Sequence, residues 1–85
     1  MEQKNQLKWV TAAQILNEYK LHITFNDGKQ SVFDCLPLIE KYEIFTPLRD
    51  KDVFSQFNLD GWTVSWLNGS IDIAPEYLYE AGKVA

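Results

Sequence analysis

The chain has 85 residues, a size at which one hydrophobic core can stabilise a fold without disulfides or metals. Hydrophobic residues make up 46% and aromatic residues 14% of the chain, which argues against disorder for most of it. The single cysteine excludes an intrachain disulfide, and no signal peptide or membrane-spanning apolar run is recognisable, so we expect a reducing, cytoplasmic location and no membrane partner. The formal charge of −4 is opposite to that of a nucleic-acid-binding domain, so no direct nucleic-acid contact is expected.

The clearest predicted element is a half-buried strand at residues 19–26, where apolar side chains occupy the odd positions and polar ones the even positions. Asp27-Gly28 follows it and is a strong hairpin signal, because both central positions of a type I′ turn need a positive φ. Residues 29–35 are therefore predicted to return as the partner strand.

The register of this hairpin stays open. A two-residue loop would set Val32 opposite Ile23, whereas a three-residue loop with a bulge would set Phe33 there.

Residues 9–16 fit two kinds of element. Thr11 and Gln14 could form a capping box and the alanines favour a helix, yet the segment also alternates as a strand does. Because the short link at residues 17–18 suits a hairpin better than a tight joint between helix and strand, we predict a strand.

Two short helices are predicted to cover the sheet. Pro37 suits the first turn of one helix, and Asp50 suits the N-cap of another over residues 51–55. Between them, Thr46-Pro47 predicts an extended chain. The apolar residues expected to pack in this part of the chain are Leu36, Leu38, Ile39, Tyr42, Ile44, Phe45, Val53, Phe54 and Phe57.

A second hairpin is predicted from residues 56–59, an Asp60-Gly61 turn and residues 62–67. Alternation in its second strand puts one set of side chains on the inner face and Thr63 and Ser65 on the other. The expected inner set is Trp62, Val64 and Trp66.

The last part of the chain is predicted to be a turn, a short extended piece and a helix. Asn68-Gly69 signals the turn, and residues 71–73 are expected to be extended. Pro75 suits the first turn of the helix, and Gly82 can close it with a left-handed C-terminal cap.

Strands joined by hairpins, with short helices between them, predict an α+β fold. We expect a mostly antiparallel sheet of about five strands built from two hairpins, with short helices including one at the C-terminus. One domain is expected over residues 1–85, with residues 1–6 and 83–85 mobile.

Several short motifs lie along nearly the whole chain: Tyr19-Lys20-Leu21 leading to Thr24-Phe25-Asn26-Asp27-Gly28, Phe33-Asp34 with Leu36, Phe45-Thr46-Pro47-Leu48, Phe54, Trp66-Leu67-Asn68-Gly69, Asp72-Ile73-Ala74-Pro75-Glu76 and Leu78-Tyr79. In this combination the chain resembles the bacterial family catalogued as domain of unknown function 2442. Ser70 lengthens the family's usual spacing between Asn-Gly and Asp72 by one residue.

The resemblance implies a small α+β fold with a strand at residues 9–16. It also implies a small intracellular protein, often encoded beside another short protein as in toxin and antitoxin pairs. Some similar proteins carry an added helix-turn-helix, and we expect none here because the chain ends too early.

No residue is assigned a catalytic, cofactor-binding or metal-binding role. Cys35 is interpreted as a buried structural residue, and His22 as a residue of the polar strand face. One histidine and one cysteine are too few soft ligands for a metal site, and the glycines are too dispersed for a phosphate loop. The carboxylates weighed for acid–base chemistry are interpreted as solvated or as hydrogen-bonding turn residues: Asp34, Glu40, Asp72 and Glu76.

Aromatic side chains near the C-terminus are the best candidates for contact with a partner. Tyr77 and Tyr79 point about 200° apart around a helix, so one of them should lie on the rim. Trp62 and Trp66 are expected mainly in the core. The partner-binding candidates are Tyr77, Tyr79, Trp66 and Asp72.

Our leading hypothesis is a non-enzymatic interaction or regulatory module, antitoxin-like, that binds another small protein through a sheet edge or an aromatic rim. The adjacent gene is the expected source of that partner. The alternative is a small ligand-binding domain or enzyme that uses Cys35 or a carboxylate in a cleft formed on homo-oligomerisation.

Overall fold

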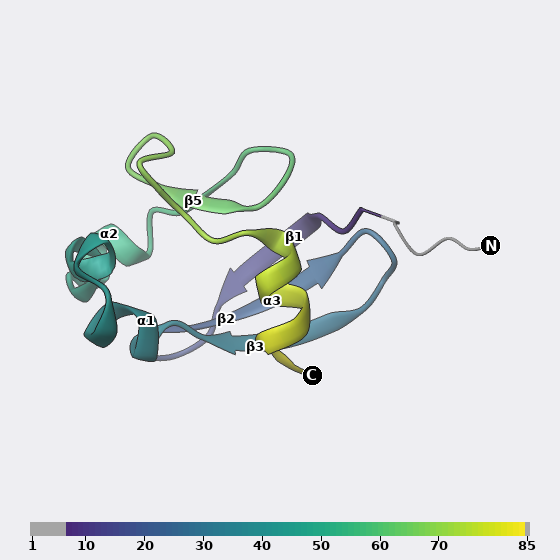
Figure 1. The fold of residues 1–85 in the computed structure, drawn as a ribbon, viewed down its shortest axis with the longest axis horizontal. Coiled ribbons are helices and arrows are strands. Elements are labelled where there is room, and N and C mark those ends of the chain that lie inside the picture. Colours follow the sequence, from purple (N-terminus) through teal and green to yellow (C-terminus); the bar gives the residue numbers. More distant parts are fainter. Residues whose placement is uncertain (1–6, 85) are drawn as a thin grey trace.

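Two separate antiparallel sheets make up the strand part of the fold (Figure 1), which is described for residues 7–84 of the computed structural model. The larger sheet holds four strands, in spatial order β1 (Val10–Ile15), β2 (Lys20–Phe25), β3 (Gln30–Asp34) and β7 (Lys83–Val84). The smaller sheet holds β4 (Asn58–Leu59), β5 (Val64–Trp66) and β6 (Ile71–Asp72).

The helical segments connect the two sheets. They are α1 (Leu36–Lys41), the 3-10 helix η1 (Glu43–Arg49), α2 (Lys51–Phe54) and α3 (Pro75–Ala81). In Figure 1, α1 and α2 lie together at one end of the molecule, and α3 lies on the side of the larger sheet that faces β5. None of the helices within residues 7–84 has the length and apolar character needed to cross a membrane.

The α+β class and the helix at the C-terminus are confirmed, but the single sheet of about five strands is wrong. The two hairpins do not pair with each other, because β5 has β4 on one side and β6 on the other. The free side of β3 is taken by the end of the chain, where Lys83 pairs with Val32 and Val84 pairs with Ser31. Residues 83 and 84, expected at a mobile end, are therefore part of a sheet; residues 1–6 and 85 lie outside the described residues.

The first hairpin has a register that neither alternative anticipated, since Ile23 lies opposite Ser31. Its loop has three residues, at 26–28, because Phe25 N–H donates to Lys29 C=O and Gly28 N–H donates to Phe25 C=O, both at 2.9 Å. Gly28 has a φ of 89°, which is the left-handed position that such a loop requires.

The strand predicted at residues 9–16 is confirmed as β1 and pairs with β2. A bulge interrupts this pairing between Val10 and Ala12. Side chains on one face of the hairpin, among them Leu21, Ile23 and Phe25, are fully buried.

Both predicted short helices are present, with Pro37 in the first turn of α1. At α2, the carboxylate of Asp50 accepts the N–H of Asp52 at 2.9 Å, which confirms the N-cap. The extended chain predicted at Thr46-Pro47 is wrong, because Pro47 lies within η1. The φ of proline suits a 3-10 helix, and so short a helix loses few hydrogen bonds to the missing N–H.

One continuous core joins the two sheets and the helices. Trp66 has no exposed surface; its indole N–H donates to Phe54 C=O at 2.9 Å, and its ring stacks on the Phe54 ring at 5.7 Å. Trp62 was expected beside it on the inner face, but it is 39% exposed. The Asp60 carboxylate accepts the N–H groups of Trp62 and Thr63, which makes both residues part of a turn before β5 begins.

The C-terminal helix ends at Gly82, but the left-handed cap predicted there is wrong, since Gly82 has a φ of −73°. A Cβ at this position would lie 2.8 Å from Ser31 Oγ and 2.9 Å from Leu78 O. Glycine is therefore required by the close approach of α3 to β3, and not by its backbone angles.

Candidate functional site

Two neighbouring hollows on the surface share Leu38 and Tyr77 in their walls. The main hollow has a volume of about 490 Å³ and lies between α1, α3 and the end of β3. The second, of about 300 Å³, lies between η1, α1 and the segment that leads from β6 into α3. We call the two together the Tyr77 groove. Its lining residues are Lys20, Val32, Phe33, Asp34, Pro37, Leu38, Tyr42, Phe45, Asp72, Ile73, Ala74, Tyr77, Ala81 and Lys83.

Tyr77 stands where the two hollows meet and is 49% exposed. The first turns of α3 carry it, and its ring meets the buried ring of Phe33 edge to face, with centroids 5.8 Å apart. This contact fixes the tyrosine ring against the sheet and leaves the rest of its surface free. The expectation that one of the two tyrosines lies on the rim is met by Tyr77.

Most of the residues that line the groove are apolar, and four of them are charged. Lys20 and Lys83 line the main hollow together with Asp34, and neither lysine forms an ion pair with another residue of 7–84. The Asp34 carboxylate accepts Leu36 N–H at 3.0 Å, the turn hydrogen bond predicted for it. Asp72 is exposed and lines the second hollow.

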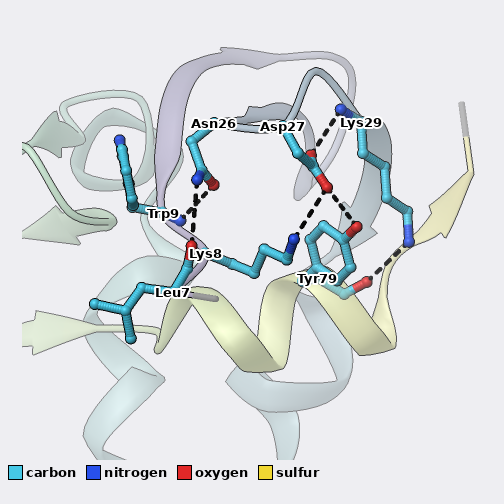
Figure 2. Close-up of polar contacts among 7 residues, drawn as sticks. All are labelled: Leu7, Lys8, Trp9, Asn26, Asp27, Lys29 and Tyr79. Carbon is cyan, nitrogen blue, oxygen red and sulfur yellow. Dashed lines mark hydrogen bonds and ion pairs between the residues drawn. The ribbon is translucent and has the colours of Figure 1, made fainter. Parts of the chain in front are cut away.

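Tyr79, the second tyrosine candidate, does not line the groove. It belongs to a separate cluster of polar contacts (Figure 2). Its hydroxyl donates to the Asp27 carboxylate at 2.6 Å, and its ring meets Phe25 edge to face at 4.9 Å. The ammonium groups of Lys29 and Lys8 lie 4.1 and 5.1 Å from the ring centroid. Such cation–π contacts and the hydrogen bond tie α3 to the loop between β2 and β3.

The cluster around Tyr79 shifts two pKa values. The hydroxyl of Tyr79, then Lys29 N–H and the Lys8 ammonium, lower the pKa of Asp27 from 3.8 to about 2. The same hydrogen bond raises the pKa of Tyr79, because the phenol must keep its proton to donate it. At neutral pH the pair is therefore a phenol bound to a carboxylate, which suits a fixed structural contact.

The four residues predicted to bind a partner do not all lie on one surface. Trp66 is buried and its indole N–H is already bonded, so it cannot serve as a surface contact. Tyr77 and Asp72 both line the second hollow, so the structure brings these two candidates together. Tyr79 belongs to the separate cluster around Asp27.

Cys35 and His22 lie on opposite faces of the larger sheet. Cys35 is 1% exposed on the inner side, and burial raises the pKa of its thiol to about 12. His22 alternates with the buried Leu21 and Ile23, so it lies on the outer face. The thiol is therefore protonated at neutral pH and has no histidine as a base. Residues 7–84 contain no group of three His, Cys, Asp or Glu side chains placed to hold a metal ion.

Sequence reasoning missed the residues that form the walls of the groove. Leu38, Tyr42 and Phe45 were expected to pack over the sheet; Leu38 and Phe45 do pack against the core, but all three also line the second hollow, and Tyr42 is 46% exposed. A weak signal existed in α1, because Leu38 and Ile39 point about 100° apart and a six-residue helix cannot bury both equally. Only Ile39 is fully buried.

A search of the curated proteins and a search of the solved structures found no match. A family model covers residues 10–84, nearly the whole chain, and carries the description "Protein of unknown function (DUF2442)". The chain belongs to this family.

Proposed function

We propose that the protein is a non-enzymatic interaction module and that the Tyr77 groove binds a short segment of another small protein. The observation that carries the proposal is the exposed Tyr77 at the meeting point of two apolar hollows. Tyrosine is enriched in protein interfaces because its ring supplies contact area at a small cost in conformational entropy, and its hydroxyl supplies a polar contact.

The charges around the groove indicate what kind of segment fits. An apolar side chain of the partner can occupy the main hollow, between Phe33 and Leu38. Lys20 and Lys83, which line this hollow, favour a carboxylate next to that side chain, since Asp34 offsets only one of the two positive charges. A short acidic segment with one large apolar anchor therefore matches the site.

A regulatory, antitoxin-like role is part of this proposal, with a partner encoded beside the protein. The state of Cys35 counts against the alternative in which this thiol is the nucleophile, because burial keeps it protonated at neutral pH.

Affinity capture from the protein's own cells tests the proposal, with mass spectrometry of the retained proteins. Wild-type protein is compared with Tyr77→Ala and with Ile44→Ala, which removes a 61% exposed apolar side chain that does not line the groove. We expect wild type and Ile44→Ala to retain one small stoichiometric protein, and Tyr77→Ala to lose it. Circular dichroism checks that both variants are folded. Retention of the same protein by Tyr77→Ala contradicts the proposal.

A small-ligand site is the second candidate, favoured by the volume of the main hollow. About 490 Å³ falls within the range of roughly 300–1,000 Å³ typical of ligand pockets. This hollow is formed within one chain, whereas the sequence suggested a cleft between copies. If it is a ligand site, protein purified from its own cells releases a small molecule on denaturation, and Tyr77→Ala protein releases less of it.

A further inference from the structure

We propose that the outer edge of β1 pairs with the same edge of a second copy of this chain and forms a two-fold symmetric dimer. The inference goes beyond the proposed function, because β1 contributes no residue to the Tyr77 groove.

The edges of the two sheets differ in how well they are protected against pairing with another strand. Among residues 7–84, the edge strands β4, β6 and β7 have two residues each, and β6 and β7 carry Asp72 and Lys83. Short edge strands and charged side chains are the usual protections. In contrast, β1 has six residues, Val-Thr-Ala-Ala-Gln-Ile, and none is charged. It is the edge most open to pairing.

The backbone of β1 offers unpaired hydrogen-bonding groups along this edge. Leu16 N–H donates to Lys20 C=O at 3.0 Å, so the backbone N–H of Leu16 points toward β2. Because inward and outward groups alternate along an antiparallel strand, the N–H and C=O groups of Ala13 and Ile15 point away from β2. Within residues 7–84 no other strand pairs with them.

One end of the edge is already closed, and this sets the length available for pairing. Val10 N–H donates to Trp62 C=O at 2.9 Å, so the turn before β5 covers the edge at Val10. The bulge at Thr11 follows directly. The regular part of β1 that has no strand partner on this edge therefore runs from Ala12 to the end of the strand.

Antiparallel pairing centred on Gln14 uses all of the outward groups of this part of β1. Ala13 of each copy then faces Ile15 of the other, and each such pair exchanges two backbone hydrogen bonds. The two Gln14 side chains face each other across the axis, where their amides can bond mutually. Ala12 faces Leu16 of the second copy, and the small alanine leaves room for a leucine that is 44% exposed.

The two ends of β1 also complement each other, which is why a second copy fits this edge. Trp9 and Trp62 stack at the N-terminal end with ring centroids 6.1 Å apart, and they are 37% and 39% exposed. The C-terminal end carries the exposed Leu16 and Glu18. An antiparallel dimer brings the exposed tryptophan pair of each copy toward the exposed Leu16 of the other.

The dimer should be weak, and salt should strengthen it. A pairing of a few residues buries less than the roughly 1,200–2,000 Å² of a stable interface. Each chain carries a formal charge of −4, so two copies repel each other until salt screens them. We therefore expect a dimer that dissociates on dilution.

Analytical ultracentrifugation over a concentration series tests the dimer, with Gln14→Lys as the disrupting variant. Two lysines facing each other across the axis should weaken association more than about tenfold, since like charges at an interface cost several kcal/mol. Gln30→Lys is the matched control: it makes the same substitution at an exposed position on β3, within the sheet. Both variants change the net charge equally, so only the position differs.

Mixing variants tests the register. Gln14→Glu alone should also be monomeric at wild-type dimer concentrations, whereas an equimolar mixture of Gln14→Lys and Gln14→Glu should restore the dimer. The proposal is overturned if the wild type stays monomeric up to about millimolar concentration, or if Gln14→Lys associates as tightly as Gln30→Lys. A dimer that the mixture does not restore overturns the pairing centred on Gln14. Capture of a partner through Tyr77 is independent of all these outcomes.

Discussion

Tyr79 shows how one side chain can hold three parts of this small protein together. It lies on α3, its hydroxyl bonds to Asp27 in the loop between β2 and β3, and Lys8 before β1 lies over its ring. The loop itself depends on Asp27, whose carboxylate also accepts Lys29 N–H at 2.9 Å. Asp27 thus has a second role beyond forming the turn that the sequence predicted.

We expect Tyr79→Phe to raise the pKa of Asp27 from about 2 toward its ordinary 3.8, because the tyrosine hydrogen bond is the largest cause of the lowered value. An NMR pH titration of the Asp27 carboxyl carbon measures this directly. Since the pKa is lowered in the folded state, the contact stabilises the protein above about pH 4 and the stabilisation is lost as the pH falls toward 2.

The same titration on Tyr77→Phe is the control, because that hydroxyl makes no bond with Asp27. An unchanged Asp27 titration in Tyr79→Phe would show that the Tyr79 hydroxyl does not bond to Asp27 in solution. Local sequence could predict that the two tyrosines point apart. It could not predict which one faces the loop, because that depends on how α3 lies across the sheet.

At the scale of elements, the contact between α3 and β3 is set by two small residues. Ser31 is fully buried, and its hydroxyl finds no hydrogen-bond partner within residues 7–84. Gly82 lies against it without room for a Cβ. The helix can therefore approach the strand closely only while both residues stay small.

We expect Gly82→Ala to lower the free energy of unfolding by about 1–3 kcal/mol, the usual cost of overpacking. Ser31→Ala alone should be neutral or stabilising, by up to about 1 kcal/mol, because it removes a buried hydroxyl that lacks a partner. Urea denaturation followed by far-UV circular dichroism gives both values.

The double variant tests whether the two positions act on each other. Gly82→Ala should cost less in the Ser31→Ala background, because the closest atom to the added methyl group is Ser31 Oγ, at 2.8 Å. If the two effects simply add, the overpacking arises elsewhere, and Leu78 O at 2.9 Å is then the responsible neighbour.

Elements with a strong local pattern could be predicted from the sequence, and elements that depend on distant contacts could not. Residues 19–26, which contain β2, alternate over eight positions, and Asp50 caps α2 by a bond to a residue two positions away. The 3-10 helix through Pro47 was missed because proline is compatible with both extended and 3-10 backbone. The hairpin register was missed because Asp27-Gly28 fits loops of more than one length.

At the scale of the whole molecule, the number of sheets could not be predicted, because strand pairing is a choice among distant partners. The groove could not be predicted either, because its walls come from α1, η1, α3 and the end of β3. Of its lining residues, only Tyr77 and Asp72 were predicted as partner-binding candidates. Lys83 lines it because the last residues of the chain pair with β3. No local pattern signals that pairing.

The two sheets are tied together through Phe54. Its ring stacks on Trp66 of the smaller sheet, and Tyr19, directly before β2, meets it edge to face at 5.4 Å. The smaller sheet has strands of only two or three residues, too short to be stable alone. Its stability must come from this shared core.

We therefore expect both sheets to unfold in one cooperative transition. A Trp9→Phe and Trp62→Phe double variant leaves Trp66 as the only tryptophan, so its fluorescence reports the smaller sheet alone. In urea, this fluorescence and the far-UV circular dichroism of the same protein should give the same midpoint and slope. Phe54→Ala should lower that midpoint strongly, since removing a buried phenylalanine costs about 3–5 kcal/mol. A fluorescence midpoint well below that of the dichroism would mean that the smaller sheet opens on its own, and that the Phe54 contact does not couple the two halves.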